Sequence, residues 1–262
     1  METPPASSPS SFPSSPVSAA KLGTVEILRR YPFKGMAGED LREAFVTYAG
    51  IAGDRAYAFI DPTNPASFPW MTGRLKREII LFRPCFLAPP DPADEHPPTD
   101  SFRMNVMTPE GHTVSVDDAA FTPFFEERFG RKLELRFSER AMHDACPLSL
   151  LGLDSIQSFS QETGIELDHR RFRANFYVRW DNGKPFYENE LVGAKLRIGE
   201  KLTVMVVKKD SRCVIITLDP STAEPSPKVL EVVAKSHANC IGVYASVLRE
   251  GIVRAGDAVC AV

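Results

Sequence analysis

The chain has 262 residues, 31 basic and 34 acidic side chains, and a formal net charge of -3. This length allows one large domain or two small ones, and the even mixture of charges argues against a nucleic-acid-binding face. No apolar run approaches the ~20 residues of a membrane span, so no membrane span is expected.

Five cysteines at irregular spacing form neither a disulfide framework nor a CxxC metal motif, which favours a reducing compartment. They are Cys85, Cys146, Cys213, Cys240 and Cys260. Residues 1–20 are mostly Ser, Pro and Ala without Lys or Arg, so we expect a disordered tail. This tail lacks the arginines of a mitochondrial transit peptide and the apolar region of a secretory signal. We therefore expect a cytoplasmic protein, with mitochondrial association left open.

Short strands are predicted through the first half of the chain, at residues 24–28, 56–60, 78–81 and 114–116. Residues 33–38 form a loop with two glycines, and the Pro-, Asp- and Glu-rich residues 89–99 are expected to be an exposed excursion. A helix should follow the last of these strands, with Pro123 in its first turn and Gly130 as its stop.

The second half shows helical spacing from Leu150 to Thr163, where Gly164 supplies the stop, and a further helix at residues 228–234. The predicted strands lie at residues 175–178, 196–198, 202–207, 214–216, 241–247 and 258–262. Many short strands and few helices predict an α+β, predominantly β fold with barrel-like sheets.

Cys213 lies between two β-branched runs and directly behind Lys208, Lys209 and Arg212. Neighbouring cations lower the pKa of a thiol, and the thiolate is the form that binds soft metals. On this segment alone a small core residue is the better interpretation, because most free cysteines are buried.

Three cations, Lys34, Arg55 and Arg173, each occupy a loop at a strand end. A guanidinium fork together with the nearby Asn175 amide could hold a phosphate or a planar heterocycle. Taken singly, each cation is better interpreted as a solvated surface charge, and Arg171 is assigned that role.

Several site motifs are absent from the sequence. It contains no G-x-G-x-x-G dinucleotide fingerprint, no P-loop and no CxxCH haem motif, and its five histidines show no metal-ligand spacing. The closeness of His143 to Cys146 is interpreted as coincidence, since adjacency in sequence does not make a catalytic dyad.

Taken in order along the chain, six short motifs resemble those of the MOSC domain family. Tyr31-Pro32-Phe33-Lys34, Gly53-Asp54-Arg55 and Thr72-Gly73-Arg74 resemble elements of the MOSC N-terminal barrel domain. Phe172-Arg173-Ala174-Asn175, Ser211-Arg212-Cys213 with the Thr217–Pro220 segment, and Gly242-Val243-Tyr244 with Gly256-Asp257 resemble the MOSC domain itself. The resemblance implies an N-terminal barrel domain at residues 21–138 and a MOSC domain at residues 139–262.

Within that family, the chain is most similar to the mitochondrial amidoxime reducing components and their bacterial counterparts. The resemblance implies a molybdenum–pterin cofactor between the two domains, with the Cys213 thiolate as a metal ligand. The positions that it assigns to the pterin and its phosphate are Lys34, Gly35, Arg55, Asp144, Arg173, Asn175, Ser211, Arg212 and Tyr244.

Three departures from the family pattern lie near these positions. Gly35 stands where Ser is common, and Asp144-Ala145-Cys146-Pro147 replaces Asp-Thr-Ser-Pro. Asn189 stands at an acidic position that lies near the metal in the relatives, so it is assigned a catalytic role in substrate choice or proton delivery.

The function implied is two-electron reduction of N-hydroxylated substrates, with electrons from a separate flavin, haem or iron–sulfur protein, because the chain has no nicotinamide-binding motif of its own. The alternative is a cofactor-binding or sulfur-carrier module without turnover. A scaffold that has lost the metal is the third possibility, which the presence of Cys213 disfavours.

Overall fold

The computed structural model describes residues 20–94, 97 and 99–262. Apart from Ala20, the tail predicted at residues 1–20 lies outside the described residues, as does part of the 89–99 excursion. Within the described residues no helix is long and apolar enough to cross a membrane.

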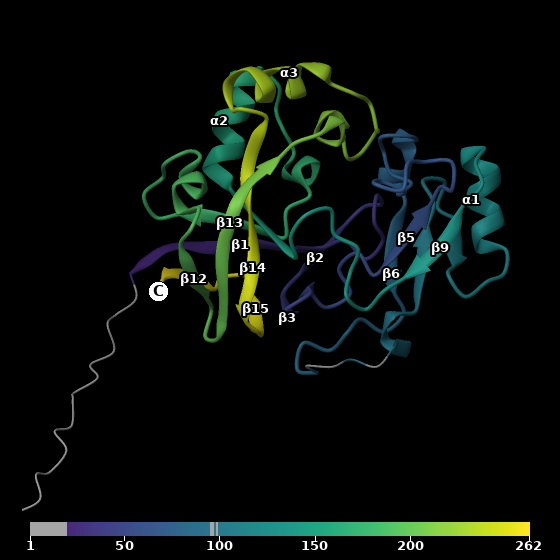
Figure 1. Cartoon of the computed structure of the whole chain (residues 1–262), viewed down its shortest axis with the longest axis horizontal. Helices are drawn as coiled ribbons and strands as arrows, with labels where there is room; N and C mark the ends of the chain where they lie inside the picture. The colour runs from purple at the N-terminus through teal and green to yellow at the C-terminus, as the bar shows by residue number, and fades with distance from the viewer. Residues whose placement is uncertain (1–19, 95–96, 98) are drawn as a thin grey trace, which may run out of the picture.

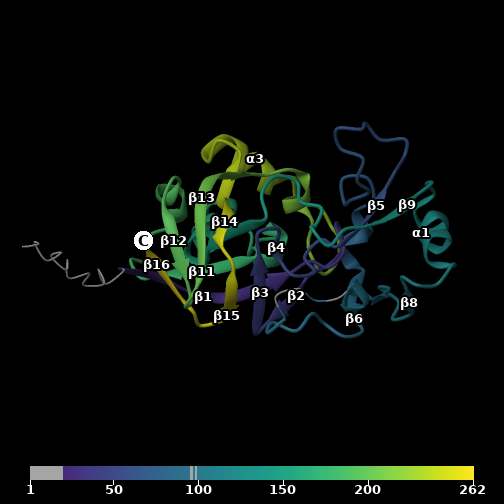
Figure 2. The ribbon, with the colours of Figure 1, turned by 60° about the horizontal axis from the view of Figure 1, so that its bottom comes forward.

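Seven strands close into a barrel, in the order β11–β10–β14–β13–β12–β16–β1, and the β1–β11 pairing completes the ring (Figure 2). The neighbours are antiparallel except for β10 and β11, which run parallel. The barrel strands are β1 (Lys21–Arg30), β10 (Leu148–Gly152), β11 (Phe176–Trp180), β12 (Lys195–Ile198), β13 (Leu202–Ser211), β14 (Cys240–Arg249) and β16 (Ala258–Ala261). Since β1 pairs with β11 and β16, the barrel contains chain from both sides of the boundary expected at residue 138.

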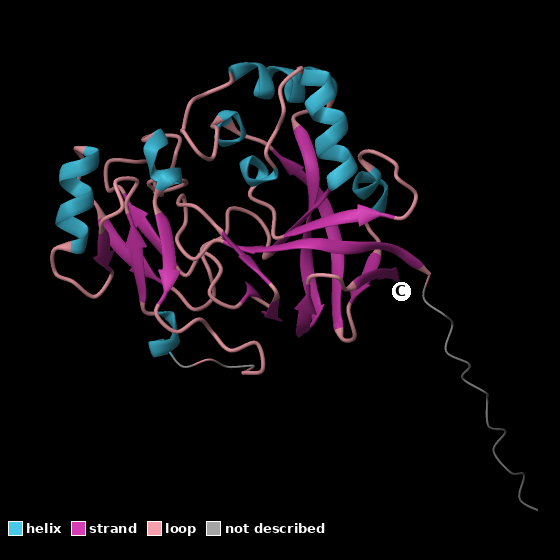
Figure 3. Ribbon diagram, turned by 180° about the vertical axis from the view of Figure 1, so that it is seen from behind, coloured by secondary structure: helices cyan, strands magenta, loops and turns pink. Residues whose placement is uncertain are grey.

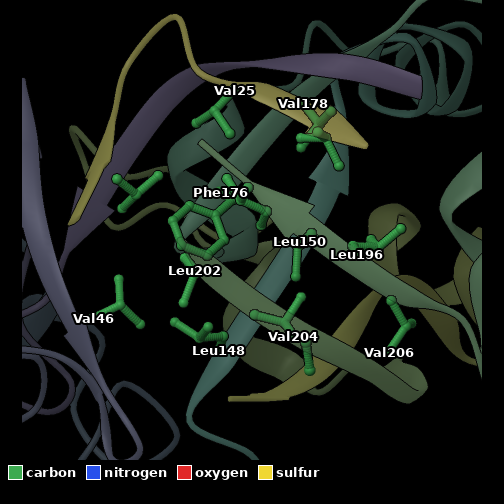
Figure 4. Packing of buried hydrophobic residues seen from close by; sticks show 14 of the residues in the cluster. Val25, Val46, Leu148, Leu150, Phe176, Val178, Leu196, Leu202, Val204 and Val206 are labelled. Carbon is green, nitrogen blue, oxygen red and sulfur yellow. The ribbon is translucent and has the colours of Figure 1, made fainter. Parts of the chain in front are cut away.

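The barrel is filled by alternate side chains of its strands. Leu202, Val204 and Val206 of β13 point inward and are fully buried, as the period of two along a strand requires. They pack against Val25 of β1 and Phe176 of β11 (Figure 4). Burying one such side chain stabilises the fold by about 1.5–3 kcal/mol, so this core holds the ring together.

The strands outside the ring form three small sheets. They are β15–β3–β4, with β3 (Glu43–Thr47), β4 (Gly50–Ile51) and β15 (Gly251–Arg254); β5 (Tyr57–Ile60) with β9 (Glu134–Phe137); and β6 (Arg83–Phe86), β7 (Met104–Met107) and β8 (Thr113–Ser115). The short β2 (Glu39–Leu41) extends the barrel sheet beside β1. In Figure 1, β5, β6 and β9 form a lobe beside the barrel, with α1 (Phe121–Phe129) on its outer side.

An aromatic cluster is the core of this second lobe. The rings of Phe33 and Phe59 lie 4.9 Å apart, and Phe125 of α1 lies 5.1 Å from Phe59. The predicted helix is confirmed here: Pro123 lies in its first turn, and Gly130 ends it in the left-handed conformation at φ 63°.

Helices α2 (Leu153–Thr163) and α3 (Pro227–Ser236) pack against each other on one end of the barrel (Figure 3). The predicted stop of α2 at Gly164 is confirmed, at φ 67°. The predicted start was too early, because Leu150 lies in β10 and the apolar spacing there continues across the strand–helix junction.

The α+β, predominantly β class is confirmed. Two predicted strands are wrong: residues 78–81 lie in the 3₁₀ helix η1 (Arg77–Leu81), and residues 214–216 in η5 (Val214–Thr217). Both runs are short and apolar, and such runs carry no periodicity that separates a strand from a tight helical turn. The other 3₁₀ helices are η2 (Thr99–Phe102), η3 (His169–Phe172) and η4 (Tyr187–Leu191).

Candidate functional site

A cavity of about 410 Å³ is lined by side chains from both halves of the chain. Most of the residues that the sequence analysis assigned to a site lie on its walls: Lys34, Gly35, Arg55, Asp144, Arg173, Ser211, Arg212, Cys213 and Tyr244. Residues from six separate stretches of the sequence therefore meet at one place. We call it the first cavity.

Arg55 and Arg173 lie on the same aromatic ring. The guanidinium carbon of Arg173 is 4.4 Å from the centre of the Tyr31 ring, and that of Arg55 is 4.9 Å from it. Both residues have a left-handed backbone, at φ 49° for Arg55 and φ 54° for Arg173. A non-glycine residue in this region costs about 1–3 kcal/mol and persists only where its surroundings hold it, which occurs often at functional sites.

Arg55 and Arg173 differ in their partners. Arg55 forms an ion pair with the buried Asp54, whereas the Nη1 of Arg173 donates to the Met36 carbonyl oxygen at 2.6 Å. Burial and the neighbouring Arg55 lower the pKa of Arg173 to about 10. No carboxylate in the described part of the chain pairs with Arg173, so this cation is available to a ligand.

Lys34 reaches the first cavity from the loop after β1. Its Nζ donates to Asp144 at 2.5 Å and to the Met142 carbonyl oxygen at 2.7 Å. Burial lowers the pKa of Lys34, and Asp144 partly compensates for this by favouring the charged amine. The pKa of Asp144 is also lowered: burial disfavours its carboxylate, but Lys34, Arg55 and Arg74 together outweigh that effect. Lys34 and Asp144 thus form an ion pair at the cavity wall.

Asn175 lies beneath the first cavity instead of lining it. Its Nδ2 donates to Asp54 at 3.3 Å and to the Arg29 carbonyl oxygen at 3.2 Å, and its Oδ1 accepts from the Ser149 amide at 3.2 Å. Asp54 in turn accepts from the Tyr31 amide at 2.7 Å. Asn175 is thus a positioning residue that holds the Asp54 carboxylate beside Arg55.

Cys213 is the residue at which the chain leaves β13 and enters η5. It is half-buried and lines the first cavity, which places its thiol within reach of a ligand. Arg212, predicted to act on this thiol, is buried and turned to other groups: it donates to the carbonyl oxygens of Ile241 and Phe172 at 2.8 and 2.7 Å. Its Nη2 also forms an ion pair with Asp210 at 2.9 Å.

Asp210 and Tyr244 add a protonatable pair to the cavity wall. Burial raises the pKa of the Asp210 carboxyl, although Arg212 opposes this. Burial and the nearby Asp210 carboxylate raise the pKa of Tyr244. The Lys208 ammonium lies 5.9 Å from the centre of the Tyr244 ring.

Asn189 does not line the first cavity. It lies in η4, where its Oδ1 is buried without a hydrogen-bond partner. The histidine near Cys146 is also engaged elsewhere: the Nε2 of His143 lies 2.8 Å from the Ala49 carbonyl oxygen. No His143–Cys146 hydrogen bond occurs in the described part of the chain.

The interpretation of Arg171 as a surface cation was wrong. Arg171 is 5% exposed, donates to the Thr217 carbonyl oxygen at 2.8 Å and pairs with Asp219 at 2.9 Å. Its position after a charged run resembles a solvated surface, and only the packing of η3 against η5 buries it.

Tyr31, Asp54 and Asp210 are site residues whose roles the sequence analysis did not recognise. Tyr31 and Asp54 are in the quoted motifs, three residues before Lys34 and directly before Arg55. The sequence signal that could have identified Tyr31 and Asp54 is an aromatic residue and an acidic residue close to cations at strand ends.

Comparison with known proteins finds a family model that matches the second half of the chain. Residues 137–260 match the family model of the MOSC domain. No curated protein matches the chain.

Among solved structures, the YUAD protein from Bacillus subtilis superposes with a TM-score of 0.50 at 14% identity, over 90% of this chain and 93% of that chain. At this identity the likeness concerns the fold alone. YiiM from Geobacillus stearothermophilus (TM-score 0.36, 14% identity, 45% of this chain and 54% of that chain) and YiiM from Escherichia coli (TM-score 0.34, 15% identity, 45% and 54%) also match.

Proposed function

Because this chain carries a MOSC domain over residues 137–260, a family associated with molybdenum-cofactor binding, we propose that its first cavity binds a molybdenum–pterin cofactor. The protein then reduces N-hydroxylated small molecules by two electrons, drawn from a separate flavin, haem or iron–sulfur protein in the cytoplasm. The observation that carries this proposal is the meeting of Cys213 with three cations, Lys34, Arg55 and Arg173, in one cavity.

The residues of the cavity fit such a group. A pterin cofactor carries a phosphate, and Arg173 supplies a half-buried guanidinium that has no carboxylate partner among the described residues. Cys213 supplies a soft sulfur ligand. No group of three His, Cys, Asp or Glu side chains in the described residues could hold a metal ion, so the cavity offers the metal one cysteine and leaves its other ligands to the pterin.

When bound, the cofactor supplies the redox chemistry of the reaction. The chain supplies binding and orientation. Arg173, Arg55 and Lys34 bind the anionic part, Ser211 and Tyr244 supply hydroxyl groups, and the backbone at Gly35 (φ 89°) allows close approach. Gly35 is tightly enclosed, since a Cβ there would lie 3.2 Å from the Met71 carbonyl oxygen.

The test has two stages, which separate the enzyme from a carrier module. Protein from a host that makes the cofactor is first assayed for molybdenum by mass spectrometry and for pterin by fluorescence. Absence of both overturns the cofactor proposal. Reduction of benzamidoxime with an artificial electron donor then distinguishes a reductase from a cofactor-binding or sulfur-carrier module, which would hold the cofactor without turnover.

A further inference from the structure

A second cavity, of about 510 Å³, adjoins the first. The two share Arg171, Arg173 and Ile215, so they meet at these three residues. The second cavity extends away from Cys213, between β6 with the β7–β8 turn on one side and η3 with η5 on the other. We call it the arginine cavity.

Five arginines line the arginine cavity, against one acid, Glu39. Three of these arginines form ion pairs with aspartates: Arg29–Asp40 at 2.7 Å, Arg170–Asp168 at 2.6 Å and Arg171–Asp219 at 2.9 Å. Glu39 is paired with Arg30, at 2.8 Å. Arg83 and Arg173 have no carboxylate partner within the described residues. Arg83 lies on one side of the cavity and Arg173 on the other. With the cofactor phosphate at Arg173, Arg83 keeps an uncompensated positive charge among the described residues of the cavity.

Two of the compensated arginines still carry unused donors. Arg29 is 4% exposed and Arg171 is 5% exposed, and the Nε of each is buried without a hydrogen-bond partner. A buried polar group left unpaired is costly. Both atoms are covered by protein behind the cavity wall, so they add positive potential to the wall and are not themselves contacts for a ligand.

The rest of the wall is apolar. Ile80, Pro84, Met107, Ile215 and Leu218 contribute to it, and the Tyr31 ring lies on the side of Arg173. An inorganic ion would make no contact with the apolar part of the wall. A molecule that has an apolar body and an anionic end would use both parts of the wall.

We propose that the arginine cavity binds organic anions, with a carboxylate or phosphate group at Arg83 and an apolar body against Ile80, Met107 and Leu218. Resting on the proposed function, this names the substrate class: an N-hydroxylated molecule that also carries an anionic group. Because Arg173 lies on both cavities, such a molecule reaches toward the first cavity while its anionic end stays in the second.

The direct test measures binding without catalysis. The full chain is titrated with 2-naphthoate and with 2-naphthamide, which have similar size and shape but differ in charge, and affinities are measured by calorimetry. We expect naphthoate to bind at least about tenfold more tightly than naphthamide, with an affinity that falls as salt is added. Equal affinity for the two compounds, or no binding of naphthoate, overturns the proposal.

Arg83→Gln is the informative variant, because Arg83 is exposed on β6 and lies outside the first cavity. Arg249→Gln is its matched control, an exposed arginine on β14 that lines neither cavity. We expect Arg83→Gln to weaken naphthoate binding about fivefold and to leave naphthamide binding unchanged. Equal naphthoate affinity in the two variants contradicts the proposal.

Pterin content separates a substrate from the cofactor's own phosphate. Arg83→Gln should retain as much pterin as Arg249→Gln, and a specific loss would assign the arginine cavity to the cofactor and overturn the proposal. With enzyme that contains molybdenum, the ratio of kcat/KM for 4-carboxybenzamidoxime over benzamidoxime should also fall about fivefold in Arg83→Gln. If the protein holds no molybdenum, the proposed function fails while the naphthoate titration still decides whether the cavity binds anions.

Discussion

Arg55 and Arg173, 118 residues apart in sequence, are joined by a hydrogen bond from the Arg55 Nη2 to the Arg173 carbonyl oxygen at 3.2 Å. Both have the left-handed backbone, and both guanidinium groups lie over Tyr31. The bond joins a loop of the first half to the end of η3 in the second half. The spacing of the two cations is therefore a property of how the halves pack.

Replacing Arg173 by Lys keeps the positive charge but removes the planar fork and its stacking on Tyr31. We expect pterin content to fall several-fold, with an unchanged circular dichroism spectrum. Arg249→Lys is the control and should retain full pterin content. Lys34→Ala and Arg55→Ala should lower the pterin content in the same way, and full content in all three site variants would place the cofactor elsewhere.

Cys213→Ser should abolish turnover, because an uncharged hydroxyl is a poor substitute for a thiolate at a soft metal. Pterin content should stay close to that of the wild-type protein, since the cations that hold it are untouched. Cys240→Ser, a half-buried cysteine of β14 outside the first cavity, should keep its activity. Normal turnover in Cys213→Ser is incompatible with a role as metal ligand.

Asp54→Ala should lower the free energy of unfolding by about 3–5 kcal/mol, since removing one partner of a buried ion pair leaves the other charge uncompensated. Asp54 is 1% exposed and accepts from the Tyr31 amide and the Asn175 Nδ2 as well as from Arg55. Urea unfolding measures the change. Asp181→Ala, which breaks an exposed ion pair with Lys21, should change stability by less than about 1 kcal/mol. Similar values for the two variants would contradict the role of Asp54.

Asp61 should make the stability of the folded protein depend on pH in the acidic range. Its carboxylate is fully buried and accepts from the Thr63 amide at 2.9 Å and from Arg131 at 2.5 Å. Burial alone would raise the pKa, but these hydrogen bonds outweigh it and lower the pKa of Asp61 below its ordinary 3.8.

A carboxyl whose pKa is lower in the folded state stabilises the protein above its unfolded pKa and loses that contribution as the pH falls through the folded pKa. Asp61→Asn should therefore be less stable than the wild-type protein near neutral pH. The difference should shrink below about pH 4, as followed by thermal unfolding between about pH 7 and pH 3. A difference that stays constant with pH would show that the charge of Asp61 contributes nothing.

The isolated chain should not reduce benzamidoxime with NADH or NADPH alone. Its sequence has no dinucleotide fingerprint and no cysteine cluster for an iron–sulfur centre, so it lacks a visible route for electrons from a nicotinamide. Adding a flavin, haem or iron–sulfur carrier protein should start turnover, which is measured as formation of benzamidine. Steady NADH-driven reduction by the pure chain would refute this prediction.

Local features of the chain were predictable because their causes are local. The alternation of Leu202, Val204 and Val206 predicts a half-buried strand, and Gly130 and Gly164 predict helix ends, since each depends only on backbone preference and on the period of apolar residues. The family motifs also predicted a relation between distant residues. They assigned Lys34, Arg55 and Arg173 to one site, and the tertiary structure brings these residues to one cavity.

The sequence by itself thus predicted the predominantly β class, most element positions and nine of the residues that line the first cavity. Only the tertiary structure decided the burial of Arg171, the 3₁₀ turn after Cys213, the position of Asn189 outside the first cavity, and the shared Tyr31 platform. The physical reason is that periodicity reports which face of an element is apolar, whereas burial and ion pairing depend on which distant segment packs there. For Arg55 and Arg173 that segment is 118 residues away, and no local pattern encodes it.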